Sequence, residues 1–431
     1  MKEIEEAKEI LSNFKEFEIY GEEEQETNYD LKENELSLLK KREKGLAFRV
    51  IEGGHKIDFC IACFPDWQNK LKDITYNLKN WSELVKKEDI SLPEARFGYR
   101  SEEKRELIDE KDLLDKVRHI KDTAQTIDKR VRVKQVSSSM VKKCISIWSN
   151  KGIDCTDEHV LYTAEGMALA VDKDAQIGFC AKDGTIFNTI DAEEIGRKMA
   201  SRAIEKLGAK TLEKGTYNIV LSSRVMRQFL SFFSSAFEGD SVLKHATILE
   251  DRIGTKIVSA LINIIDDGTM ESGVGTSLCD CEGIPTQKTK LVENGILKNF
   301  LHNSFTSKEL NYENTANAFR ENYRQTLKIT PTNIYIENGA EKNILLLMNN
   351  GLYITELLGL HTANQITGDF SVGISGQKIK NGRKYEPFRG ATMTGNILTL
   401  LSKVFAISEK IEFLSAVGAP DIGIEDVSVG G

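Results

Sequence analysis

The chain has 431 residues, 40% of them hydrophobic and 29% charged, and its formal net charge is −8. This length exceeds what one ordinary core organises, so two or three globular domains are expected. The acidic balance excludes a protein that binds nucleic acid through a dense basic stripe, and the short run Lys40-Lys41-Arg42, flanked by Glu35 and Glu43, indicates a solvated strand or turn.

The first 210 residues divide into two blocks of strands and helices, at about 1–90 and 105–210. In the first block a helix is expected over 2–13 and another over 66–85. Between them, apolar segments separated by turns at Gly45 and at Gly53-Gly54 predict a small β-meander. These segments cover residues 17–20, 36–39, 46–50 and 57–64.

The second block begins with an expected helix over 107–127. A further helix, from about 192 to 208, starts at a capping-box-like pair, Asp191 and Glu194. Four strands are expected between these helices, at 131–136, 141–149, 160–171 and 177–181. A glycine, a polar run and a new strand over 217–221 then mark a domain boundary near residues 207–215.

Residues 211–431 are predicted to be rich in strands. Ser222 or Ser223 can cap an amphipathic helix, and a late helix is expected over 396–404. Four Asn-Gly pairs favour two-residue hairpins; they begin at Asn294, Asn338, Asn350 and Asn381. We therefore predict an α+β fold: an N-terminal α/β-meander region, residues 1–210, and a C-terminal domain, residues 211–431, dominated by antiparallel β-sheet with a few helices.

The charged start of the chain predicts no secretion signal, and no run of about 18 apolar residues predicts a membrane span. Seven cysteines, an odd number, are expected to be free thiols of a cytoplasmic protein. Cys60 and Cys63 form a CxxC with no second pair at zinc-finger spacing, so buried core thiols are expected. Cys279-Asp280-Cys281-Glu282 is interpreted as a packed strand near Gly283, with a metal or redox role as the alternative.

Sequence motifs for serine, phosphate and calcium chemistry are incomplete. Gly373-Ile-Ser-Gly-Gln lacks the last glycine of a serine nucleophile motif, and no phosphate loop is present. Asp266, Asp267 and Glu271 lack the alternating spacing of a calcium loop. The six histidines are all more than seven residues apart, which excludes a helical zinc pair. A scattered metal site from His302, His361, Asp369 and Glu282 stays open as an alternative.

The glycine-rich stretch from Gly351 to Gly395 is the first candidate for a binding surface. Twelve of the 32 glycines lie in the last 81 residues, about twice an even share. Such clustering implies tight turns or close backbone approach. The polar or glycine positions expected to contact a ligand are His361, Asn364, Gly368, Asp369 and Ser371; Asp369 as a turn-forming residue is the alternative.

Several segments resemble the TldD/PmbA family, and in particular its PmbA branch, also called TldE. The most specific is Thr367-Gly-Asp-Phe-Ser-Val-Gly-Ile-Ser-Gly376, followed by Thr394-Gly-Asn396. The resemblance is dense after residue 215 and weaker before it. Further support comes from residues 45–50, 280–286, 290–295, 331–333 and the ending Val427-Ser-Val-Gly-Gly431.

This resemblance implies a cytoplasmic heterodimeric peptidase that processes or degrades peptides in an enclosed cavity. In that family the TldD-type subunit carries zinc, through a His-Glu-x-x-x-His helix and a late cysteine. The corresponding segments here, residues 232–238 and 416–421, contain neither histidine nor cysteine. The chain is therefore similar to the non-zinc partner. No catalytic residue, metal ligand or cofactor is assigned to it, and zinc is expected in the partner subunit.

The leading hypothesis is a subunit that pairs with a TldD-type zinc peptidase and contacts a peptide or unfolded protein by strand addition near residues 368–376. The isolated chain is expected to form a homodimer. One alternative is a stand-alone metallopeptidase with the scattered site described above. The other is a non-enzymatic regulator, for example a modulator of DNA gyrase, which the family's older name suggests.

Overall fold

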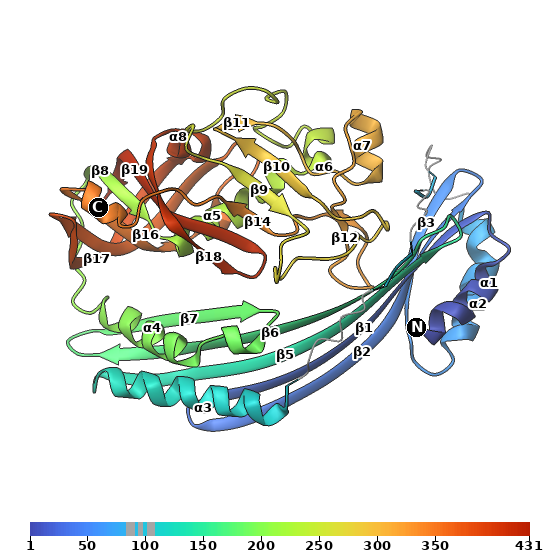
Figure 1. Ribbon diagram of the computed structural model, residues 1–431, viewed down its shortest axis with the longest axis horizontal. Coiled ribbons are helices and arrows are strands. Elements are labelled where there is room, and N and C mark those ends of the chain that lie inside the picture. The colour runs from blue at the N-terminus through green and yellow to red at the C-terminus, as the bar shows by residue number, and fades with distance from the viewer. Residues whose placement is uncertain (83–90, 94–97, 101–107) are drawn as a thin grey trace.

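The computed structural model describes residues 1–82, 91–93, 98–100 and 108–431, and it shows two domains stacked on each other (Figure 1). The first domain is built on one long, curved antiparallel sheet in the order β3-β2-β1-β5-β6-β7, with the short β4 also pairing with β6. Its strands are β1 (Glu16–Lys32), β2 (Glu35–Glu52), β3 (His55–Ala62), β4 (Gly98–Arg100), β5 (Val131–Ser149), β6 (Asp154–Val171) and β7 (Ala175–Gly184).

Four helices cover one face of this sheet because alternate strand residues point to the same side. Ile19 of β1 packs with α1 and α2, while Tyr29 and Leu31 of the same strand pack with α3 and α4 at the other end. Tyr20 points to the opposite face of the sheet, where it packs with Ala47 against the second domain. The helices are α1 (Lys2–Leu11), α2 (Trp67–Ser82), α3 (Glu110–Ile127) and α4 (Ala192–Ile204), with the short η1 (Phe187–Thr189) before α4.

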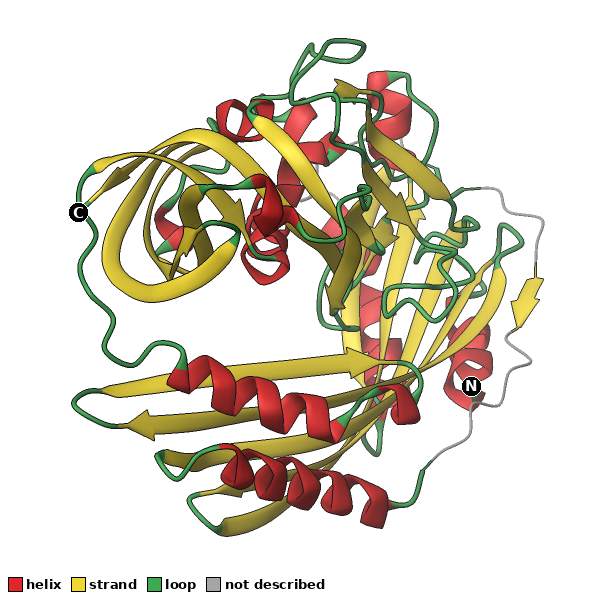
Figure 2. Ribbon diagram, turned by 60° about the vertical axis from the view of Figure 1, so that its left-hand side comes forward, coloured by secondary structure: helices red, strands yellow, loops and turns green. Residues whose placement is uncertain are grey.

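The second domain contains a closed ring of strands, β8-β15-β16-β17-β19, which closes because β19 pairs with both β17 and β8. Figure 2 shows these strands curling round beside the C-terminus. From β19, the strands β14, β9, β10 and β11 extend the sheet, and β18 pairs with β19. Two pairings, β14 with β19 and β15 with β8, are parallel, so this sheet is mixed.

The bounds of the second domain's strands are β8 (Gly215–Leu221), β9 (Ile264–Asp267), β10 (Lys288–Glu293), β11 (Ile296–Leu297), β12 (Ala318–Phe319), β13 (Lys328–Ile329), β14 (Ile334–Ile336), β15 (Asn350–Leu358), β16 (Asp369–Lys380), β17 (Arg383–Asn396), β18 (Val404–Leu414) and β19 (Val417–Gly430). Its helices are α5 (Ser223–Phe233), α6 (Gly239–Leu243), α7 (Ser304–Leu310) and α8 (Ile397–Ser402), with the short turns η2 (Ser234–Phe237), η3 (Ile344–Leu347) and η4 (Leu360–Thr362).

Helix α5 anchors the core of the second domain. Ser222 caps its first turn by accepting a hydrogen bond from the Val225 N–H. Its apolar stripe is fully buried against the ring, and Phe229 meets Phe370 of β16 edge-on at 5.2 Å between ring centroids. The side of α5 that carries Arg224 faces α4 of the first domain, so this helix contributes to both the core and the domain interface.

The predicted α+β class is confirmed, and so are the main helices and the hairpins at Asn294-Gly295 and Asn381-Gly382. Three predictions were wrong. Gly45 is not a turn: it lies inside β2, where an added Cβ would come within 2.2 Å of the Tyr323 ring. Asn338-Gly339 and Asn350-Gly351 do not form hairpins: the Gly339 N–H donates to the Ser408 carbonyl, and Asn350 and Gly351 are the first two residues of β15. Cys60, in the edge strand β3, is exposed, and Cys63, directly after that strand, is half-buried.

Two other expectations need a smaller correction or fall outside the description. Cys279 and Cys281 are buried as expected, but they lie in a turn, where Asp280 accepts backbone hydrogen bonds from Glu282 and Ile284. The expected helix ends at 83–85 and the start at 107 lie outside the described residues. Of the helices in the described part of the chain, none combines the length and the apolar character needed to cross a membrane.

Candidate functional site

The residues singled out from the sequence lie on the exposed loop between β15 and β16 and at the start of β16. His361, Asn364, Asp369 and Ser371 are exposed. Asn364 and Asp369 are engaged by their own loop: the Asn364 side-chain oxygen accepts from the Ile366 and Thr367 N–H groups. Asp369 accepts from the Thr367 hydroxyl at 2.7 Å and from the Asn396 amide at 2.9 Å.

The hydrogen bonds that Asp369 accepts from Asn396 and Thr367 stabilise its carboxylate and so lower its pKa. Gly368 is buried at φ +79° against Ile397, a conformation that favours glycine. The loop is therefore a self-contained turn. The contact of its five residues with a ligand stays a prediction.

Strand addition was expected near residues 368–376; it conflicts with the sheet over residues 373–376, whereas residues 369–372 pair with β17 alone. β16 pairs with β15 on one side, from Gly373 to Lys380, and with β17 on the other, from Asp369 to Lys380. A strand flanked on both sides offers no row of free backbone groups to a peptide. The glycines there serve another purpose: a Cβ on Gly376 would lie 2.0 Å from the Tyr353 carbonyl oxygen.

The scattered metal site does not assemble. Glu282 is buried and accepts from Arg49 at 3.2 Å and from the Ser304 N–H at 2.8 Å. His302 is buried beside Thr306, and burial lowers its pKa to about 4. His361 lies on the exposed loop described above, and Asp369 lies at the start of β16. Among the residues that the structure describes, no group of three or more His, Cys, Asp or Glu side chains is placed to hold a metal ion.

The helix segment where the resemblance places a zinc motif contains neither histidine nor cysteine. Residues 232–238 span the end of α5 and η2, and Phe233, Ala236 and Phe237 pack in the domain core. Neither these side chains nor the segment 416–421 offers a soft metal ligand. The residues present at this position do not fit a zinc ion.

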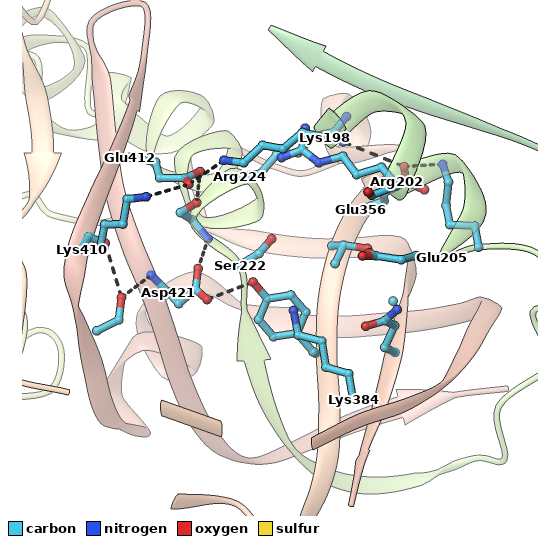
Figure 3. Close-up of a pocket in the computed structure, with 18 of the residues that line it drawn as sticks. Lys198, Arg202, Glu205, Ser222, Arg224, Glu356, Lys384, Lys410, Glu412 and Asp421 are labelled. Atoms are coloured by element: carbon cyan, nitrogen blue, oxygen red, sulfur yellow. Dashed lines mark hydrogen bonds and ion pairs between the residues drawn. The ribbon is translucent and has the colours of Figure 1, made fainter. Parts of the chain in front are cut away.

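A cleft with a volume of about 620 Å³ lies between the two domains. Helix α4 forms one wall; the first turn of α5, the strands β15–β17 and the ends of β18 and β19 form the other (Figure 3). Its lining has eight basic and five acidic side chains, whereas the whole chain carries net charge −8. Ion pairs bridge the domains at the cleft, Lys198 to Glu412 at 3.2 Å and Lys206 to Glu356 at 2.8 Å.

A second polar group lies across the cleft from α4. Asp421 accepts from the Ser223 N–H at 2.7 Å and from the Tyr353 hydroxyl at 2.9 Å. Burial raises the pKa of Asp421. The Lys384 ammonium lies 3.3 Å from the Tyr353 ring centroid, and burial lowers its pKa. In Figure 3, Asp421 and Lys384 project into the same space as Arg224 and Glu356.

Two features of the sequence point to this cleft, and both concern charged residues rather than the spacing of apolar ones. Glu194, Lys198 and Arg202 recur every four residues and so share one face of α4, and Lys206 continues this spacing just beyond the end of the helix. Helix α5 has no acidic residue in its first turn but carries Arg224 there. A cation near a helix N-terminus opposes the helix dipole. Such a local conflict is expected at functional positions.

Fold and site together define a two-domain α+β protein with a polar, net-basic cleft between its domains. Models of one protein family match most of the chain: the PmbA/TldA metallopeptidase central domain over residues 103–207 and the C-terminal domain over residues 214–431. The chain belongs to the PmbA/TldA metallopeptidase family.

Individual relatives agree with this assignment. An uncharacterized protein of Methanocaldococcus jannaschii is 30% identical over 374 residues, which cover 85% of this chain and 84% of the relative. A metalloprotease PmbA homolog of Buchnera aphidicola is 26% identical over 57% of this chain and 53% of its own.

Solved structures share the whole fold. A putative modulator of a DNA gyrase from Thermotoga maritima has a TM-score of 0.90 at 25% identity, with 99% of this chain and 100% of the other covered. TldE from Thermococcus kodakarensis also has a TM-score of 0.90, at 21% identity, with 100% and 99% covered.

Proposed function

We propose that this chain is the PmbA/TldE-type subunit of a TldD/TldE-type metallopeptidase complex that processes or degrades peptides in the cytoplasm. In this proposal the TldD-type partner carries the zinc, and this chain encloses the cavity and contacts the peptide. The observation that carries the proposal is the family match over residues 103–207 and 214–431, combined with residues 232–238, which contain neither histidine nor cysteine and do not fit a zinc ion.

Other observations support the same proposal. Relatives named as TldD homologs and as PmbA homologs both match this chain, so both kinds of subunit occur in the family. The interdomain cleft is wide and polar, and its lining offers ion-pairing groups of both signs to an extended peptide. The cysteines are all free thiols, as expected in a reducing compartment.

Reconstitution tests this proposal. The purified chain, a TldD-type protein from the same source and an equimolar mixture are compared for size by light scattering, for zinc by metal analysis and for cleavage of a fluorogenic peptide. We expect a one-to-one complex that contains zinc and cleaves the peptide, and a chain alone that does neither. Stoichiometric zinc and chelator-sensitive cleavage by the chain alone would instead support a stand-alone metallopeptidase. If no complex forms, the role as a partner subunit is refuted.

A further inference from the structure

Three arginines converge where the interdomain cleft opens into a smaller cavity of about 230 Å³. Arg202 comes from α4, and Arg224 and Arg227 come from the first two turns of α5. The remaining walls are β7 of the first domain and β18 of the second. Cations from both domains therefore face one pocket, and the ion pairs Lys198–Glu412 and Lys206–Glu356 link the two domains beside it.

The three guanidinium groups have few acceptors. Arg202 donates to the Phe179 carbonyl at 2.7 Å. The nearest carboxylate oxygen to Arg224 is Glu356 Oε1 at 4.0 Å, and Lys206 already binds that atom at 2.8 Å. The Nε of Arg227 is buried without a hydrogen-bond partner among the described residues. Because each guanidinium carries five N–H donors, most of these donors are unused.

The neighbouring carboxylates are engaged with other donors. Glu412 binds Lys198 through one oxygen and the Ser223 hydroxyl through the other, at 3.2 and 2.9 Å. Asp183, which also lines the smaller cavity, accepts from the Ser415 N–H at 2.6 Å. The partly buried cluster thus keeps a net positive charge, since its pocket is lined by more basic than acidic side chains.

Such an arrangement is costly for a purely structural role. The like charges repel each other, and burial adds to this cost, as the lowered pKa values of Arg224 and Arg227 show. The helix dipole of α5 makes its first turn still less suitable for a cation. A bound anion would offset the repulsion between the arginines, the cost of burying their charge and the opposing helix dipole. A guanidinium group recognises a planar carboxylate through two parallel hydrogen bonds.

We propose that Arg202, Arg224 and Arg227 bind a carboxylate group of the peptide substrate, either its free C-terminus or an acidic side chain. This inference rests on the proposed peptide-handling function and specifies how the cleft orients the peptide. The Arg224 side chain keeps 28% of its surface exposed, so a peptide in the cleft can reach it.

Fluorescence polarisation with three labelled decapeptides of glycine and serine tests the proposal on the intact chain and on its complex. The first has a free C-terminus, the second a C-terminal amide, and the third an amide and one internal aspartate. We expect the amide to bind about tenfold or more weakly than the free acid, as for a lost hydrogen bond to a charged group. Tight binding of the aspartate peptide would identify an acidic side chain as the source, and weak binding would identify the C-terminus.

Arg224→Gln and Arg227→Gln should each remove the preference for the carboxylate peptide and leave the amide's affinity within about twofold. Arg118→Gln is the matched control, since Arg118 lies on α3, has a 61% exposed side chain and pairs with Asp115. Equal affinity of the wild-type chain for the free acid and for both amides would overturn the proposal. So would a loss of the carboxylate preference in Arg118→Gln as large as that in the Arg224 and Arg227 variants. Cleavage of the amide peptide by the complex would then leave the proposed function intact.

Discussion

At the residue scale, charged side chains of this chain either pair with a neighbour of opposite charge or have a pKa that burial shifts. Glu43, for example, lies between Arg324 and Lys41, whose hydrogen bonds lower its pKa to about 2. Glu238, at the start of α6, is different. Burial, followed by the nearby charge of Asp240, raises its pKa to about 7. The structure therefore favours a protonated Glu238 where a solvated glutamate would be ionised.

This shift makes a prediction for the pH dependence of stability. The pKa of Glu238 in the folded chain lies above the value of about 4.3 of an unfolded glutamate. The protonated Glu238 side chain therefore contributes fully to the free energy of unfolding below pH ~4.3, and this contribution is lost as the pH rises through about 7. Glu238→Gln, which cannot ionise, should match the wild type at pH 4.5 and exceed it by about 1–2 kcal/mol at pH 7.5, with allowance for solvent access.

Urea unfolding at the two pH values measures this difference. The exposed Glu193→Gln on α4 serves as a charge-matched control and should show the same difference from wild type at both pH values. A constant offset between Glu238→Gln and wild type across this range would show that Glu238 is ionised in the folded chain.

At the element scale, the patterns visible in the sequence located helices and strands better than their ends. The apolar stripe of α5 depends on local periodicity, which the sequence displays directly. Long-range contacts do not appear there. Gly45 looked like a turn because nothing nearby in the sequence shows that Tyr323 packs on it. The ring closure of β19 onto β8 likewise depends on residues about 200 positions apart.

The candidate site shows the same limit. The glycines and polar residues at 351–395 were a visible cluster, yet the loop uses their hydrogen-bonding groups itself. The cleft joins α4, α5 and strands up to Asp421, so no single window of sequence contains it. What the sequence does show of the cleft is local, such as Arg224, a cation placed unfavourably in the first turn of α5.

Close backbone contact between α4 and β7 places the basic face of α4 in the cleft. A Cβ on Gly178 of β7 would lie 2.0 Å from the Met199 carbonyl oxygen and 2.4 Å from the Ala203 nitrogen. Backbone atoms of a helix cannot yield as a flexible side chain can. Gly178→Ala should therefore push α4 off the sheet and destabilise the chain by about 1–3 kcal/mol.

Thermal and urea unfolding test this expectation, with Gly184→Ala as the control in the same strand, where the nearest atom would lie at an ordinary 3.6 Å. The Gly178 variant should also lose affinity for the carboxylate peptide, since Lys198 and Arg202 move with α4. A Gly178 variant as stable as the control would mean that the helix and the sheet separate at little cost.

At the scale of the whole molecule, the first domain leaves an open sheet edge. In the described part of the chain, β2 pairs with β3 only from Gly45 to Glu52, so residues 35–43 have no strand on their outer side. Leu36 and Leu38 are 47% and 46% exposed on this segment, and their cross-strand neighbours Leu31 and Tyr29 pack towards α3. An open edge with apolar side chains favours association with another chain.

We expect the isolated chain to be a homodimer at micromolar concentration that uses this edge, and a TldD-type partner to displace one copy. Leu38→Lys should raise the dimer dissociation constant about tenfold or more, because a lysine ammonium would be buried in the interface. Light scattering across a dilution series measures it, with Leu346→Lys as a matched control, since Leu346 is 70% exposed on η3 of the other domain. A wild-type monomer at these concentrations would refute the homodimer, and equal weakening by both variants would place the interface elsewhere.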